Sequence, residues 1–197
     1  MLETPKDDAT TKVKSASYVP MDNQQATPAE IGYLAAMLEG EGTISLNVRK
    51  KRATKRNGTQ GVDISLNIAN TDPAIVQKCA AIIRSFGIEP YIHCYERKGG
   101  WKDCWHVVIS RISSAAKLLP VLIPHLAGHK KHKAELVLSF LERRLSRTTA
   151  RARKSGPVWY DEEDWNIVRK IYEHDGKDLS LKVPRDYTPP AELVRVQ

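Results

Sequence analysis

Two pairs of strand-like runs, separated and flanked by helical segments, constrain the fold of this chain most. Polar and apolar residues alternate over residues 43–48 and 62–69, and a second pair of runs covers residues 91–96 and 105–110. Alternation with a period of two is typical of a strand that buries one face. A glycine-containing segment lies between the members of each pair, so each pair is predicted to form a hairpin.

Helical segments precede, separate and follow the two hairpins. Thr27 and Glu30 have the spacing of a capping box, and Pro28 suits the first helical position, so a helix is predicted from there to near Gly40 or Gly42. Further helices are predicted over residues 74–86, 113–122, 130–146 and 165–174.

The order of these elements predicts an α+β domain, in which an antiparallel sheet carries helices on one face. Pro120 and Pro124 are expected to break the helical region after the second hairpin. We place the domain at residues 27–146. Residues 1–26 are predicted to be a disordered arm, and residues 147–197 to be a basic linker, a short helix and a C-terminal tail.

The chain carries an excess of basic residues. Lys and Arg number 31 against 23 Asp and Glu, which gives a formal net charge of +8 at pH 7. Such an excess favours a polyanionic partner, because each neutralised phosphate releases condensed counterions. The basic residues gather in three clusters, at residues 49–56, 130–133 and 143–154. This distribution predicts an extended surface for nucleic acid.

Membrane and secreted proteins are disfavoured. No apolar run approaches the roughly 18–20 residues that cross a bilayer, and residues 1–14 lack the apolar middle of a secretion signal. Three cysteines are too few, and of the wrong parity, for a disulfide scaffold. We expect an intracellular protein in a reducing compartment, either cytoplasm, nucleoid or organelle, with no membrane partner.

Cysteines and histidines flank the turn of the second predicted hairpin. Cys94 and Cys104 could lie roughly opposite each other, with His93 and His106 beside them. Two Cys and two His can bind zinc, but His93 and Cys94 point to opposite faces of a strand, which spoils a four-ligand site. A pair of incidental buried thiols is the favoured interpretation, and an occasional disulfide is the other alternative.

The first predicted helix carries a stripe of small residues. Gly32, Ala36 and Gly40 recur every fourth residue, and Ala35 adjoins them. Small residues at this spacing let a second backbone approach closely. The stripe fits either tight packing inside one monomer or a self-paired helix. Since the chain has one copy, a self-paired helix would need a second chain across a two-fold axis.

Acidic residues follow at the end of this helix. In a self-paired arrangement, two copies of Glu41 would meet at the foot of the interface, and carboxylates this close repel unless divalent cations lie between them. Hard oxygen ligands of this kind suit Mg²⁺ held on a scissile phosphate. The alternative interpretation is a solvated helix end that bears Glu39 and Glu41.

The sequence YLAAMLEGEGTI of residues 33–44 resembles the signature of the LAGLIDADG homing endonucleases. The similarity continues through residues 67–73, 86–88 and 118–136, and covers about residues 27–146. It implies an αββαββα-like fold with a saddle-shaped antiparallel sheet that lies in the major groove of DNA. It also implies a homodimer with the two motif helices, through Gly32, Ala35, Ala36 and Gly40, at the interface.

The resemblance also implies catalytic roles, position by position. Glu41 matches the acid that coordinates the catalytic metal, with Gly40 beside it. Asn70 matches the polar residue that helps to order the attacking water. Lys130 best matches the basic residue near the scissile phosphate, and Lys131 is the alternative. The implied cofactor is Mg²⁺, with Mn²⁺ or Ca²⁺ able to occupy the same site, and no small-molecule cofactor is expected.

Strand alternation predicts which side chains face DNA. The apolar residues of the first strand pair share one phase and should face the helices, while the polar residues share the other phase and can contact base edges or phosphates. The predicted DNA-contacting residues are Ser45, Asn47, Arg49, Lys51, Arg52, Lys55, Arg56, Asp63, Ser65, Asn67 and Lys131.

The resulting hypothesis is a homodimeric, Mg²⁺-dependent homing endonuclease of the intron-homing kind. It would cut both strands of a long pseudo-palindromic target and leave short 3′ overhangs. One alternative is a catalytically inactive relative that binds DNA or RNA as an intron maturase or regulator. Another is an interaction protein with acidic protein partners, for which DNA affinity would hardly change with salt.

Overall fold

The computed structural model describes residues 26–49, 61–97, 99–151 and 160–177. Apart from Ala26, the predicted N-terminal arm lies outside these residues, as do residues 178–197. The elements are α1 (Pro28–Glu41), β1 (Gly42–Val48), β2 (Val62–Asn70), α2 (Pro73–Ser85), β3 (Tyr91–Tyr95), β4 (Cys104–Ile109), α3 (Ile112–Leu122), the 3₁₀ turn η1 (Ile123–His125), α4 (Gly128–Arg151) and α5 (Glu162–His174). None of these helices is both long and apolar enough to cross a membrane.

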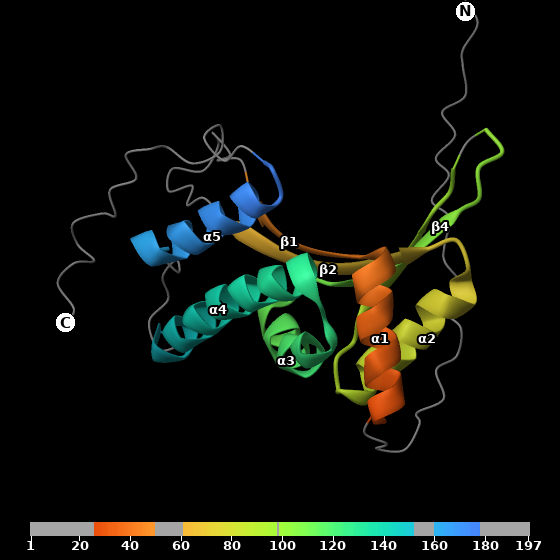
Figure 1. The fold of residues 1–197 in the computed structure, drawn as a ribbon, viewed down its shortest axis with the longest axis horizontal. Coiled ribbons are helices and arrows are strands. Elements are labelled where there is room, and N and C mark those ends of the chain that lie inside the picture. Colours follow the sequence, from red (N-terminus) through yellow and green to blue (C-terminus); the bar gives the residue numbers. More distant parts are fainter. Residues whose placement is uncertain (1–25, 50–60, 98, 152–159, 178–197) are drawn as a thin grey trace, which may run out of the picture.

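The four strands form one antiparallel sheet in the order β1-β2-β4-β3. Gly42 lies opposite Ile68 at one end of the β1–β2 pair, and Val48 lies opposite Val62 at the other. Figure 1 shows a curved sheet with α1, α2, α3 and α4 on one side of it. The predicted α+β class, with helices on one face of an antiparallel sheet, is confirmed.

The start and the end of α1 follow from its sequence. Thr27 and Glu30 form the predicted capping box: the Glu30 N–H donates to Thr27 Oγ1 (3.3 Å), and the Thr27 N–H donates to Glu30 Oε2 (2.8 Å). The helix ends at Glu41 because the chain turns at Gly42 directly into β1. A Cβ on Gly42 would lie 2.6 Å from the Leu38 carbonyl oxygen, so the close turn requires glycine here.

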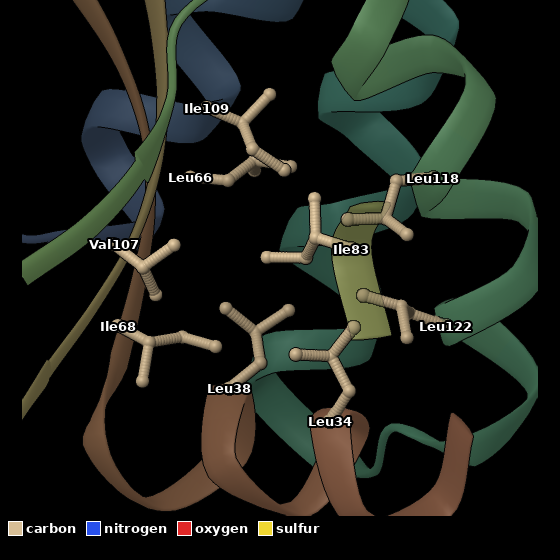
Figure 2. Close-up of a pocket in the computed structure, with 9 residues that line it drawn as sticks. All are labelled: Leu34, Leu38, Leu66, Ile68, Ile83, Val107, Ile109, Leu118 and Leu122. Carbon is tan, nitrogen blue, oxygen red and sulfur yellow. The ribbon is translucent and has the colours of Figure 1, made fainter. Parts of the chain in front are cut away.

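The centre of the core is closely packed apolar material (Figure 2). Side chains from α1, α2, α3, β2 and β4 converge there and leave a void of about 10 Å³, no more than one water needs. They are Leu34, Leu38, Leu66, Ile68, Ile83, Val107, Ile109, Leu118 and Leu122. The space between the sheet and these helices is therefore core and not a ligand cavity.

The predicted helix to residue 122 and the break at Pro124 are confirmed, but Pro120 takes no part in the break. Helix α3 continues through Pro120 to Leu122, and Pro124 lies in the 3₁₀ turn that follows. Pro120 removes the hydrogen bond to the carbonyl of Ala116. Because Pro120 is exposed, this defect lies on the solvent side of the helix, where water can replace the missing N–H.

The C-terminal helix belongs to the same core. Helix α4 runs through the predicted boundary at residue 146 to Arg151, and α5 packs against it with buried Trp165, Val168 and Ile171. The hydroxyl of Tyr172 accepts from the Val48 N–H (3.1 Å), and that of Tyr160 accepts from the Val62 N–H (2.9 Å). Residues 160–177 thus support the far end of the β1–β2 pair.

Candidate active site and DNA-binding face

Glu41 stands where α1 meets the sheet. It is the last residue of α1, it is exposed, and its carboxylate has no hydrogen bond or ion pair with any other described residue. The backbone carbonyl of Gly40 lies in the same final turn, beyond the last helical hydrogen bond, which the Gly42 N–H donates to the Leu38 carbonyl. The Gly40 carbonyl and the exposed Glu41 carboxylate are therefore neighbouring oxygen donors at the helix end.

Two polar side chains fasten this end of α1 to the start of α4. Lys130 Nζ donates to the carbonyl oxygens of Leu38 (2.8 Å) and Glu39 (2.5 Å). In return, Glu39 Oε2 accepts from the N–H of Ala127 (3.3 Å). A positive charge at the C-terminal end of a helix also complements the helix dipole. Together these contacts, named the α1–α4 clasp, fix the helix end that carries Glu41.

The α1–α4 clasp distinguishes Lys130 from Lys131, the two alternatives that the sequence left for the basic residue of the site. Lys130 is half-buried, and this burial lowers the pKa of its ammonium group, while Glu39 and then Glu41 act in the opposite direction. The Lys131 ammonium group has no hydrogen bond or ion pair with α1 among the described residues, and the Lys131 N–H donates to the Ala127 carbonyl (3.1 Å). The structure thus brings Lys130, and not Lys131, to the end of α1.

Asn70 lies at the same end of the sheet as Glu41. It ends β2, two residues after Ile68, and Ile68 is opposite Gly42, the residue that follows Glu41. Asn70 Oδ1 accepts from the N–H of Asp72 (2.9 Å), which leads into α2. The carbonyl oxygen of this amide is therefore already engaged, whereas its NH₂ group has no partner among the described residues.

The residues present fit part of a divalent-cation site. Within the described part of one chain, no group of three or more His, Cys, Asp or Glu side chains could hold a metal ion. The Glu41 carboxylate and the Gly40 carbonyl are hard oxygen donors of the kind that Mg²⁺ and Ca²⁺ prefer. Two such groups are too few for a full coordination shell, so further ligands would have to come from a second chain, from phosphate oxygens or from water.

The face of the sheet turned away from the core helices is polar, as predicted. Ser45 lies opposite Ser65 and Asn47 opposite Asp63, and Asn47 Nδ2 donates to Ser45 Oγ (3.2 Å). Arg49 forms a two-pronged ion pair with Asp63. Because this pair is exposed, it is worth no more than about 1 kcal/mol, and a phosphate can compete for the guanidinium group.

Several predicted DNA contacts are not on the described sheet. Lys131 lies on α4. The remaining four, which lie outside the described residues, are Lys51, Arg52, Lys55 and Arg56.

Three of the four residues predicted for the dimer interface, Gly32, Ala36 and Gly40, have free space beside them within their own chain. Ala36 and Gly40 are exposed, and a Cβ added at Gly32 or Gly40 would meet no atom within 4 Å. Ala35 does not belong to this stripe: it is 1 % exposed and packs in the core. Residues along a helix are about 100° apart, and this rotation turns Ala35 from Ala36 toward the core side.

The positions of Cys94 and Cys104 in the second hairpin contradict both a shared zinc site and a disulfide. Cys94 lies opposite Trp105 and Cys104 opposite Tyr95, so the two thiols point to opposite faces of the sheet, and both are free. On the polar face, His93 and His106 are opposite each other, with their rings stacked at 4.9 Å between centroids.

Sequence reasoning missed this aromatic group on the polar face. Tyr91 and Tyr95 flank the imidazoles and are 66 % and 57 % exposed. The signal was present: Tyr91, His93 and Tyr95 alternate and therefore share one face of β3.

Comparison with known proteins gives one family. The family model described as "LAGLIDADG-like domain" matches residues 28–121, which extend from α1 into α3. No curated protein matches the chain.

Two solved structures show the same fold. The group I intron-encoded homing endonuclease I-CeuI complexed with DNA superimposes with a TM-score of 0.51 and 20 % identity, over 80 % of this chain and 72 % of that one. The meganuclease I-SmaMI bound to uncleavable DNA gives a TM-score of 0.50 and 14 % identity, over 73 % of this chain and 43 % of that one.

Proposed function

Because residues 28–121 form a LAGLIDADG-like domain, we propose that this chain is a homodimeric, divalent-metal-dependent endonuclease that cuts both strands of a specific DNA site. The observation that carries this proposal is the position of Glu41. Its free carboxylate lies at the foot of an open small-residue stripe, beside a lysine that holds the helix end.

The open stripe supports the homodimer. Gly32, Ala36 and Gly40 have no need to be small within one chain, because side chains there would point into empty space. A second α1 packed on this stripe would bring its own Glu41 next to the first. Two chains would then supply the oxygen ligands that one chain lacks.

In the proposed reaction, each residue at this end of the sheet has a separate task. Glu41 and the Gly40 carbonyl would hold Mg²⁺, which when bound supplies Lewis-acid stabilisation and lowers the pKa of coordinated water. The Asn70 amide NH₂ would hydrogen-bond the attacking water. Lys130 has one N–H left after its two bonds to α1, and this would face the negative charge that develops on the phosphate.

The polar face of the sheet supports DNA as the substrate. Its serine, asparagine and arginine side chains offer hydrogen bonds to base edges and phosphates, and the chain has a net charge of +8. A two-fold dimer would read a long, pseudo-palindromic site. Cleavage is proposed to leave short 3′ overhangs, as for an enzyme of intron homing, and sequencing the ends of cut DNA tests this.

The proposal is tested on Glu41→Gln, which keeps the size of the side chain and removes its charge. Selection of cleaved sites from a randomised duplex pool in Mg²⁺ gives the target, on which the variant is expected to bind in Ca²⁺ but not to cut. Glu142→Gln, an exposed carboxylate on α4, is the matched control and should cut normally. Cutting by Glu41→Gln would remove Glu41 from the site.

The same selection decides between the active enzyme and an inactive relative. If the wild-type chain binds duplex DNA but cuts nothing from the pool in Mg²⁺ or Mn²⁺, the chain is a DNA-binding relative of the family. If its DNA affinity does not fall as salt rises, phosphate contacts are excluded and the basic surface serves another partner.

A further inference from the structure

The polar face of the sheet carries an imidazole pair that the proposed function leaves unused. His106 of β4 and His93 of β3 stack nearly parallel, with 9° between the ring planes. Tyr95 stands at right angles to both rings, at 4.6 Å from His93 and 4.9 Å from His106. Tyr91 also stacks on His93, with 5.2 Å between the ring centroids.

A hydrogen bond fixes the tautomer of His106. Its Nδ1 lies 3.1 Å from Oδ1 of Asn67 on β2. An amide oxygen can only accept, so Nδ1 carries the hydrogen. In the neutral ring Nε2 then bears a lone pair, and no partner for Nε2 is found among the described residues. Only the protonated ring can donate from Nε2.

The imidazole pair lies near the proposed catalytic end of the sheet. His106 is opposite Ala69, the residue after Ile68, and His93 continues the same row. The row of Ala69, His106 and His93 is the next one along the sheet after the pair Gly42 and Ile68. Glu41 directly precedes Gly42 at the end of α1. Adjacent strands are about 4.8 Å apart, so His106 lies on the order of 10 Å from the line of β1.

We propose that His106 is a proton-dependent DNA contact: on binding the duplex, Nε2 takes up a proton from solvent and donates to a DNA acceptor, either a phosphate oxygen or a guanine edge. This inference rests on the proposed function, since it requires that the polar face binds DNA. Asn67 would then have a second task beside the predicted DNA contact, because its amide oxygen orients His106 while its NH₂ group can still donate to DNA.

The surroundings of His106 favour the neutral ring in the absence of DNA. Burial, then the neighbouring His93 and then Arg97 lower the pKa of His106 below its usual value. The other groups that face the ring are Tyr95 from β3 and uncharged Asn67 and Ala69 from β2, and no carboxylate does so among the described residues. DNA supplies the missing negative charge. The Tyr95 ring, with its centroid within 6 Å, can also stabilise an imidazolium.

The two ring nitrogens of His93 are closed to a ligand. Neither has a hydrogen-bond partner among the described residues, and both are buried. His93 therefore supports His106 by stacking, and its own nitrogens are not the contact.

The test measures Kd for DNA in Ca²⁺ at constant ionic strength, from about pH 8 to about pH 5.5, on either side of the histidine reference pKa. Two probes are used, a mixed-sequence duplex and the duplex selected by cleavage. For the wild-type chain, Kd should fall as the pH is lowered. One linked proton limits this slope to about tenfold per pH unit. His106→Gln should bind as the wild type does at pH 8 and lose most of this slope.

The controls separate this contact from other histidines. His125→Gln changes an exposed imidazole in η1, off the sheet, and should keep the wild-type slope. If His106→Gln loses the pH dependence of Kd on both duplexes, the acceptor is a phosphate oxygen. If it loses that dependence only on the selected duplex, the acceptor is a guanine edge. An unchanged slope in His106→Gln overturns the proposal while leaving the endonuclease intact. Failure of the wild-type chain to bind DNA at any pH overturns both proposals.

A measurement on the wild-type chain covers the case in which His106→Gln does not fold. NMR titration of the His106 ring gives its pKa with and without the mixed-sequence and the selected duplex. We expect that pKa to rise by about one unit in the complex, which corresponds to a total fall in Kd of up to about tenfold over the pH range. A pKa that is the same in both states, or lower with DNA, contradicts proton uptake at Nε2.

Discussion

At the scale of single residues, Lys130 combines a structural contact with a proposed role in the reaction. Two of its three N–H groups bind carbonyl oxygens in the last turn of α1, and the third remains for the proposed contact with phosphate. Its partner in the α1–α4 clasp, Glu39, lies two residues before Glu41 but has its carboxylate on the Ala127 N–H. Of the two acids in this turn, only Glu41 is left for a cation.

The double role of Lys130 leads to a prediction with two readouts. Lys130→Met should lower the unfolding free energy by about 1–3 kcal/mol, because two hydrogen bonds from a charged donor to the end of α1 are lost. It should also slow single-turnover cleavage on the order of 10²-fold, the usual effect of losing one electrostatic stabiliser. Urea unfolding and cleavage of the selected duplex measure the two effects. Lys131→Met is the control: with enzyme in saturating excess, so that a weaker DNA contact does not limit the rate, it should change neither quantity. The reverse result would assign the role to Lys131.

Other residues in the site show why some roles could be predicted and others could not. Glu41, Asn70 and Lys130 follow from the resemblance to the family, and the register and the clasp bring them to one end of the sheet. Ala35 was misplaced because spacing of small residues does not reveal which side of a helix is buried. The contact of His106 with Asn67 joins residues 39 positions apart, and only strand order β2-β4 brings them together.

At the scale of elements, α1 is one helix with two different sides. Leu34 and Leu38 fill the core, while Gly32 and Ala36 face away from their own chain. The double variant Gly32→Leu with Ala36→Leu should therefore leave the monomer folded and abolish the dimer. Helix propensity even favours the change, since glycine costs about 1 kcal/mol in a helix interior.

Sedimentation measures the oligomeric state of this double variant, and circular dichroism its helix content. Gln77→Leu, on an exposed position of α2, adds similar apolar bulk elsewhere and should remain dimeric. A double variant that is still a dimer would place the interface on another surface. Loss of helix content, in contrast, would show that α1 needs small residues within its own chain.

The elements themselves were largely readable from the sequence, and the exceptions have physical causes. Capping residues and strand alternation act locally, so the start of α1 and all four strands were predicted within two residues. The tolerance of α3 for Pro120 depends on which side of that helix meets solvent, which is a property of packing. Packing also decides that α4 continues to Arg151, beyond the predicted boundary.

At the scale of the whole molecule, the core extends beyond the part that resembles the family. The family match ends at residue 121, yet α5 contributes a buried face and anchors both strands of the first hairpin. Trp165, Val168 and Ile171 recur every third residue, so an amphipathic helix was visible in the sequence. The sequence did not show what this face of α5 covers, because β1 and α5 are more than a hundred residues apart.

This arrangement predicts that α5 unfolds together with the sheet. Trp165 is fully enclosed, and Trp165→Ala should lower the unfolding free energy by about 3–5 kcal/mol in a single transition, because a large buried side chain is lost from a shared core. Urea unfolding followed by circular dichroism and by hydrogen exchange of β1 and β2 measures this. Lys170→Ala, on the exposed side of the same helix, should cost little. If α5 melts first and the protection of β1 and β2 is unchanged, residues 160–177 are an appendage to the α+β domain and not part of its core.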